Sequence, residues 1–172
     1  MKKKMIVRII ICFLAMMSFM CLTAEAKAKR QQVKGNAMPK YLDRQIQTCN
    51  AKKLLEVVES KYATESHLMS VAEIVKDYDA YRFITKKEAI KLAKAIIKNE
   101  KCTSKVFKEL IYSDSFEICL MVAKSKKCNE GTLKFLAEIV ACYDEYCRYS
   151  EKEAIKLAKA IIKNEKCTSK VF

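Results

Sequence analysis

The feature that most constrains this chain is a long exact repeat. The residues at 87–107, KEAIKLAKAIIKNEKCTSKVF, recur without a change at 152–172, an offset of 65. Further matches upstream run at the same offset from Leu68 with Leu133 to Tyr81 with Tyr146. Self-similarity at a fixed period is typical of stacked repeat arrays. We therefore expect a tandem 65-residue duplication, with copies at about 43–107 and 108–172 and an incomplete last unit.

A shorter period lies inside the long one. The segments IIKNEKCTSKVFKELI and MVAKSKKCNEGTLKFLA align on Cys102 and Cys128, at an offset of 26. In both segments an apolar residue follows the cysteine after five positions and again after eight. The segment VESKYATESHLMSVA aligns with them and has Ala63 in place of the cysteine. Each unit is predicted to be a helix, a short turn and a second helix.

The composition favours helices throughout. The chain has 2 Gly and 1 Pro in 172 residues, which argues against sheets with many tight turns and against Gly-rich phosphate loops. Thr85 with Glu88, and Ser150 with Glu153, have the spacing of a helix-capping box. Amphipathic helices must bury their apolar faces against neighbours, so the predicted fold is all-α, an α-solenoid of stacked helical hairpins. The expected helices lie near 50–61, 66–80, 86–100, 104–113, 115–126, 131–144 and 151–165.

Two segments, MVAKSKKCNEGTLKFLAEI and AIIKNEKCTSKVFKELI, resemble the leucine-rich-repeat variant and HEAT-like α-solenoid families. In those families a small or polar residue precedes a turn, and a Leu-x-x-Leu-Ala helix follows. The resemblance covers about residues 50–172. The chain departs from the family pattern because it lacks the usual turn prolines and has cysteine where threonine is commoner. The resemblance implies a binding scaffold and transfers no catalytic residue to this chain.

The segment 1–26 has the pattern of a secretory signal peptide. A basic start, MKKKMIVR, precedes the apolar run IIICFLAMMSFMCL, and small-x-small cleavage motifs follow at Ala24–Ala26 and Ala26–Ala28. An uncleaved anchor is the less favoured alternative, since a membrane-spanning helix needs roughly twenty apolar residues. We expect a signal peptide at 1–26, a polar linker at 27–45 and a helical repeat domain at 46–172. The protein is then secreted or cell-wall associated, without stable membrane insertion, and its Lys- and Ile-rich composition favours a bacterial source.

Cleavage would leave seven cysteines, and an odd count leaves at least one thiol unpaired in a monomer. Cys142 and Cys147 stand where the first copy has Asp77 and Arg82, which makes them a possible disulfide pair. Two separate thiols are the alternative. Wide spacing and a single histidine in the chain argue against a zinc site at the remaining repeat cysteines. The cysteines expected instead as small buried turn residues are Cys102, Cys128 and Cys167.

Catalytic residues are not identifiable in the sequence. His67 is the single histidine, and it has neither a recognisable nucleophile nor an orienting carboxylate, so we expect it to be a solvent-facing helix residue. Nucleophile-elbow, phosphate-loop, zinc-protease and dinucleotide motifs are missing from the chain. The sequence therefore predicts a protein that is not an enzyme and that uses no cofactor or metal.

The formal net charge is +14, and it is +11 after loss of the four basic residues and one acidic residue of the signal peptide. In the 86–100 helix four lysines fall within about 60° of one another, and the second copy repeats them. A solvated face is the favoured interpretation, and a polyanion-binding stripe is the alternative. We call these side chains the ridge lysines: Lys87, Lys91, Lys94, Lys98, Lys152, Lys156, Lys159 and Lys163.

The predicted function is an exported, non-enzymatic scaffold for protein–protein interaction. The alternative is electrostatic adhesion to an anionic polymer, such as wall teichoic acid or nucleic acid, through the ridge lysines. A further alternative is a truncated relic of a longer repeat protein. Because the second copy stops one turn into its last helix, we expect either self-association through the C-terminal edge or a longer parent protein of which this chain is a fragment. The apolar residues expected to be partly uncovered there are Ile155, Ala158, Ile161 and Ile162.

Overall fold

A computed structural model describes residues 38, 40–81, 83–141 and 149–171 of the chain, and the fold of these residues is all-α. The expected signal peptide at 1–26 lies outside the described residues. The chain divides into two compact units, Met1–Tyr41 and Leu42–Phe172, and the second unit carries the features discussed below. In chain order its helices are α2 (Ala51–Glu59), α3 (Glu65–Lys76), α4 (Tyr78–Tyr81), α5 (Lys86–Lys98), α6 (Ser104–Ile111), α7 (Phe116–Ala123), α8 (Glu130–Ala141) and α10 (Glu151–Ile162).

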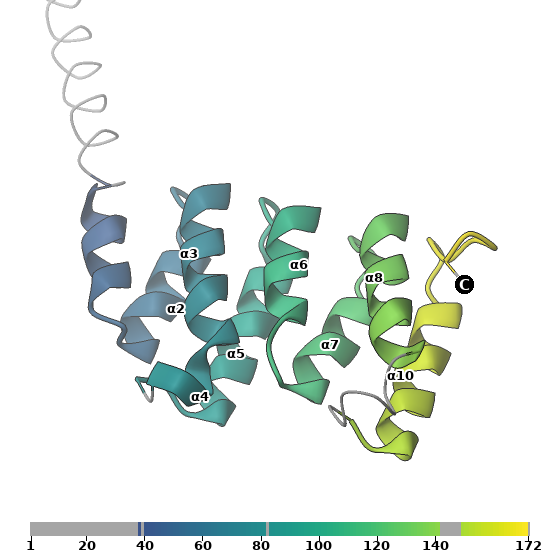
Figure 1. Ribbon diagram of the computed structural model, residues 1–172. Helices are drawn as coiled ribbons and strands as arrows, with labels where there is room; N and C mark the ends of the chain where they lie inside the picture. The colour runs from purple at the N-terminus through teal and green to yellow at the C-terminus, as the bar shows by residue number, and fades with distance from the viewer. Residues whose placement is uncertain (1–37, 39, 82, 142–148, 172) are drawn as a thin grey trace, which may run out of the picture. The chain divides into compact units, whose positions relative to one another are not determined.

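The main helices of this unit form two rows (Figure 1). In one row α3 packs on α6, and α6 packs on α8. In the other row α2 packs on α5, α5 on α7, and α7 on α10. The rows also contact each other, for example where α3 packs on α5 and α10 on α8. Because the chain alternates between the rows, each helix has neighbours from both.

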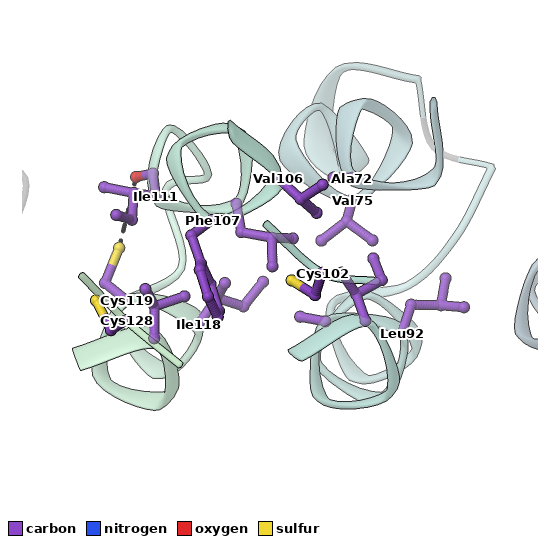
Figure 2. Close-up of a cluster of buried hydrophobic side chains, with 14 of the residues drawn as sticks. Ala72, Val75, Leu92, Cys102, Val106, Phe107, Ile111, Ile118, Cys119 and Cys128 are labelled. Atoms are coloured by element: carbon purple, nitrogen blue, oxygen red, sulfur yellow. Dashed lines mark hydrogen bonds between the residues drawn. The ribbon is translucent and has the colours of Figure 1, made fainter. Parts of the chain in front are cut away.

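The hydrophobic core lies between the two rows. Figure 2 shows Phe107 of α6 pointing toward Ile118 of α7, with Leu92 of α5 on the other side of Cys102. Phe107, Leu92 and Ile118 are all buried. Complete burial of one such side chain contributes about 1.5–3 kcal/mol to stability. The amphipathic pattern of the sequence therefore forms one continuous core.

Capping boxes set where α5 and α10 begin. The Thr85 N–H donates to Glu88 Oε2 at 2.8 Å, and the Glu88 N–H donates back to Thr85 Oγ1 at 3.3 Å. At α10, Ser150 and Glu153 make the same two bonds at 3.0 Å and 3.4 Å. Hydrogen bonds from the cap residue lower the pKa of Glu88 and of Glu153. Both capping boxes expected from the sequence are confirmed.

An asparagine just past α5 donates a hydrogen bond to a carbonyl at the end of α2, the preceding helix in the same row. Asn99 Nδ2 donates to the Val58 carbonyl at the end of α2, at 2.7 Å. Asn164, just past α10, donates in the same way to the Ala123 carbonyl at the end of α7, also at 2.7 Å. The last carbonyls of a helix have no partner inside it, and these amides satisfy one at each site.

Most expected helix ends differ from the structure by one to three residues, and two boundaries differ by more. The helix expected at 66–80 ends at Lys76, and the separate short helix α4 follows Asp77. Residues 40–47 are helical, and Leu42 is buried in the core, so helical structure begins inside the segment expected to be a polar linker. The physical reason is that Leu42 and Ile46, one turn apart, pack against the core, which a polar composition average does not reveal.

Candidate functional site

The ridge lysines all lie on the surface. The four on α5 are exposed, as are the three on α10 and Lys163 just past its end, and none of the eight is in a salt bridge among the described residues. However, α7 lies between α5 and α10 in the row, so the lysines form two groups (Figure 1). Helix α7 carries Glu117, whose Oε2 lies 3.4 Å from Lys86 Nζ. Lys156 Nζ lies 5.7 Å from the centre of the Phe116 ring, a cation–π contact with α7.

Helix α10 exposes apolar side chains that are better covered in its sequence twin, α5. Ile155 and Ile162 are 47% and 62% exposed, whereas the identical positions in α5, Ile90 and Ile97, are only partly exposed. Ala158 is half-buried, and its counterpart in α5 is buried. The physical reason is that α7 packs on α5, whereas α10 packs on α7 and α8 and no later helix of the described chain packs against it. We call Ile155, Ala158 and Ile162 the terminal face of α10.

Ile161 does not belong to this face, although the sequence predicted that it would. Its side chain is completely buried. At 100° per residue Ile161 lies about 120° around the helix from Ile155, so it faces the core while Ile155 faces outward. The expectation of an uncovered edge was therefore wrong for Ile161. It is confirmed for Ile155 and Ile162 and in part for Ala158.

His67 is a buried structural residue, and the expectation of a solvent-facing side chain was wrong. It is 5% exposed, and its Nδ1 accepts a hydrogen bond from the Thr64 N–H at 3.0 Å. Its Nε2 lies 3.1 Å from Asp43 Oδ1. His67 stands at the third position of α3, where a side chain can fold back over the cap residue and complete a capping box. Periodicity alone did not reveal this role.

Two of the three repeat cysteines are core residues. Cys102 and Cys128 are buried, as expected, and burial raises the pKa of each thiol to about 12. A thiol with such a pKa stays protonated at neutral pH and is a poor nucleophile. Cys167 is only half-buried and packs at the margin of the core, so the expectation of a buried residue was wrong there. The possible disulfide pair, Cys142 and Cys147, lies outside the described residues.

A buried sulfur contact links α7 to the start of α10. The Tyr149 hydroxyl donates to Cys119 Sγ at 3.2 Å, and Cys119 Sγ in turn donates to the Ile111 carbonyl at 3.5 Å (Figure 2). In the first copy the corresponding positions are the apolar Leu54 and Ile84. Equivalent buried positions are therefore occupied by two aliphatic side chains in the first copy and by a cysteine and a tyrosine in the second copy.

A pocket of about 350 Å³ opens beside α3. Lys76 lies in the wall of the pocket. The Lys76 ammonium donates a hydrogen bond to the carboxylate of Glu109, and this bond raises the pKa of Lys76. Phe83, largely exposed, lies at the pocket and could contact an apolar group. The sequence did not predict this pocket, because its walls come from separate segments. The lining residues are Cys49, Glu73, Ile74, Lys76, Asp77 and Phe83.

Among the described residues, no group of three or more histidine, cysteine or acidic side chains could hold a metal ion. In the same part of the chain no helix combines the length and the apolar character that a membrane crossing requires. Comparison of the sequence and structure with family models, curated proteins and solved structures found no match.

Proposed function

We propose that this protein is an exported, non-enzymatic helical-repeat scaffold that binds another protein through the terminal face of α10. The observation that carries the proposal is the comparison of α5 with α10. The two helices share one sequence from Lys87 and Lys152 onward, yet the isoleucines that are half-buried in α5, which packs between α2 and α7, are exposed in α10. Exposed isoleucines on one face of a helix form an apolar surface that a partner protein can cover.

Equivalent elements of the two copies support a tandem duplication and an α-solenoid. Helices α3 and α8 begin at Glu65 and Glu130, and helices α5 and α10 begin at Lys86 and Glu151, so both pairs keep the offset of the sequence repeat. The asparagine bonds just past α5 and α10 are equivalent as well. The resemblance to HEAT-like and leucine-rich-repeat variant families implies the same scaffold role. Export is proposed from the signal-peptide pattern of segment 1–26.

The terminal face is energetically suited to a partner helix. Burying an isoleucine side chain contributes about 1.5–3 kcal/mol when the side chain is fully exposed beforehand, so Ile155 and Ile162 together can contribute about 2–3 kcal/mol. Charged side chains flank them, among them Glu151 and Lys159, and these can select the partner.

A peptide of residues 103–124 tests this proposal directly, since that segment forms α6 and α7, which pack on α3 and α5 within the chain. The peptide carries Glu117→Lys, because Glu151 stands where the first copy has Lys86. We expect it to bind the protein in a fluorescence anisotropy titration, and Ile155→Glu with Ile162→Glu to weaken binding at least tenfold. The matched control is Tyr62→Glu, an exposed apolar side chain elsewhere. Equal binding to both variants, or no binding to the unchanged protein, would contradict the proposal.

The second candidate function is adhesion to an anionic polymer through the ridge lysines. Their uniform exposure and lack of described salt bridges favour it. A stripe of this kind binds phosphate polymers by releasing counterions, and its affinity falls steeply with salt. The probe is purified teichoic acid, with duplex DNA in a second series, between about 50 and 500 mM salt. The variant to compare carries Gln at four ridge positions: Lys91, Lys94, Lys156 and Lys159.

Glutamine and lysine have similar helix propensity, so the variant should keep its circular dichroism spectrum. If adhesion is the function, the variant should lose most of its polymer binding and much of the salt dependence. Unchanged binding would leave the ridge lysines as a solvated face.

A further inference from the structure

We propose that one edge of the two helical rows binds a linear polyol phosphate through its lysines. We call this surface the turn edge. It consists of the segments that follow the helices of the row α2, α5, α7 and α10, namely 60–64, 99–103, 124–129 and 163–171. Figure 1 shows these segments along one side of the rows, at the top of the view. The turn edge is a different surface from the terminal face of α10, and its proposed role is independent of that face.

Hydrogen bonds join neighbouring segments of the turn edge. Each of three side chains donates to a carbonyl of the preceding segment: Lys101 Nζ to Lys61 at 3.1 Å, Lys127 Nζ to Asn99 at 2.8 Å, and Asn164 Nδ2 to Ser125 at 3.1 Å. The four segments therefore form one continuous surface. By contrast, α7 lies between the two helices that carry the ridge lysines and divides them into two groups. A linear polymer can follow the turn edge without a break.

Lysine dominates the charge of the turn edge. Its four segments contain eight lysines, two glutamates and no other charged residue. The connections in the other direction, 77–85, 112–115 and 142–150, contain five acidic residues, two arginines and no lysine. All the lysines of the turn edge are exposed, and none is in a salt bridge among the described residues. They are Lys61, Lys101, Lys124, Lys126, Lys127, Lys163, Lys166 and Lys170.

Structural roles explain only part of this set. Contacts inside the protein involve three of its members, Lys61, Lys101 and Lys127. A helix dipole favours lysine in the last turn of a helix, but Lys126, Lys166 and Lys170 lie at least three residues past the end of α7 or α10. Helices α3, α6 and α8 also begin at this edge, and the positive ends of their dipoles oppose a concentration of lysine. Repulsion among these charges costs stability, and bound phosphate groups would offset it.

The residue types of the turn edge indicate which phosphate polymer fits. Surfaces that bind single-stranded nucleic acid carry aromatic side chains on which the bases stack, and base recognition often uses arginine. The turn edge has one aromatic residue, Tyr62, and no arginine. Lysine binds phosphate as a compact point charge, without the bidentate geometry of arginine. A polyol phosphate, which has one charge in each repeating unit and no base, matches this chemistry.

Two variants that lose the same number of positive charges test the proposal. The edge variant keeps the lysines that have contacts inside the protein and carries glutamine at Lys124, Lys126, Lys166 and Lys170. The ridge variant carries glutamine on α5 and α10, at Lys91, Lys94, Lys156 and Lys159. The probe is poly(glycerol phosphate), titrated by calorimetry into the full chain between about 50 and 300 mM salt. Circular dichroism establishes that both variants keep their helices.

We expect the edge variant to bind the polymer at least about tenfold more weakly than the unchanged protein. The slope of log affinity against log salt should become shallower by about three, because each lost phosphate contact removes roughly 0.7–0.9 from it. The ridge variant should bind within about threefold of the unchanged protein. Single-stranded DNA with the same number of phosphates should bind no more tightly than poly(glycerol phosphate).

Four results would overturn the proposal. If the unchanged protein does not bind poly(glycerol phosphate), the ligand class is wrong. Equal losses in the two variants would show that net charge alone attracts the polymer. A larger loss in the ridge variant would assign adhesion to the ridge lysines, as in the second candidate function. Binding of DNA about tenfold tighter than that of the polyol phosphate would show that the bases contribute, and the edge would then bind a nucleic acid instead. The peptide experiment tests the terminal face separately from all four.

Discussion

At the scale of single residues, the same position carries different chemistry in the two copies and keeps the same role. His67 and Thr132 both stand at the third position of a helix, in α3 and α8. His67 accepts the cap N–H through its ring, whereas the N–H and hydroxyl of Thr132 both donate to Asn129 Oδ1 at 2.8 Å. Helix capping and the contact with Asp43 therefore account for the burial of His67.

The buried thiols predict how stability depends on pH. In the folded protein the pKa of Cys102 and of Cys128 is about 12, above the ordinary value of 9.0, because burial disfavours the thiolate. The unfolded chain therefore releases these protons first as pH rises. The stabilisation is fully present below pH 9.0 and is lost progressively between 9.0 and about 12.

We expect the free energy of unfolding to fall by at most about 1 kcal/mol per pH unit for each thiol above that lower limit. Urea titrations at several alkaline pH values measure this slope. The double variant Cys102→Ala with Cys128→Ala should have a shallower slope, and alanine is a natural occupant here, as Ala63 shows in the neighbouring unit. Identical slopes for the two proteins would refute the assigned cause.

At the scale of elements, the residues that follow a helix form hydrogen bonds that connect successive units. The segment from Asn99 to Lys101 bonds the preceding units: Asn99 reaches the Val58 carbonyl, and Lys101 Nζ reaches the Ala63 carbonyl at 2.6 Å. Lys127 Nζ similarly bonds the Asn99 carbonyl at 2.8 Å. Part of the high lysine content therefore connects successive units and is unavailable for binding a polymer.

The matched asparagines predict equal effects at two places in the molecule. Asn99→Ala and Asn164→Ala each remove an amide donor and leave a half-buried helix carbonyl without it, so each should lower the free energy of unfolding by about 1–2 kcal/mol. Urea denaturation followed by circular dichroism measures the change. The exposed neighbours provide the controls, since Glu100→Gln and Glu165→Gln should change stability by less than about 0.5 kcal/mol. Asparagine variants as stable as the controls would show that the bonds are unimportant.

At the scale of the whole molecule, two identical segments have different surroundings. Leu92 and Leu157 are both buried, but Ile97 is half-buried and Ile162 is exposed. Helix α5 has α2 on one side and α7 on the other side of it in the row, whereas in the described chain α10 has only α7 beside it in the row. The difference locates the terminal face, and it predicts what an added helix would do.

Adding residues 108–127 after Phe172, with Glu117→Lys in the added copy, should cover Ile155 and Ile162. Burial of these two side chains, contributing about 2–3 kcal/mol, should raise the melting temperature by about 4–12 °C. Differential scanning calorimetry measures the change. An added segment of the same residues in scrambled order is the control, and an equal gain from that control would contradict specific covering of the face.

Much of the fold could be predicted, because helices are specified locally. The apolar spacing and the capping boxes at Thr85 and Ser150 predicted the first residues of α5 and α10 correctly. Helix ends were predicted less well: α3 ends at Lys76, although the expected helix continued to residue 80, and local spacing gave no signal for the break at Asp77. The eight ridge lysines were correctly expected to be exposed, because their helix face follows from periodicity alone.

The sequence by itself determined the all-α class, the repeated units and the helix faces, since each depends on contacts within a few residues along the chain. Only the tertiary structure decided which copies of those faces are covered. Ile90 and Ile155 have the same neighbours in sequence, and the exposure of Ile155 follows from which helices pack on α10. The burial of His67 against Asp43, 24 residues away, has the same origin. Burial is a property of what packs against a side chain, and that partner lies far away in sequence.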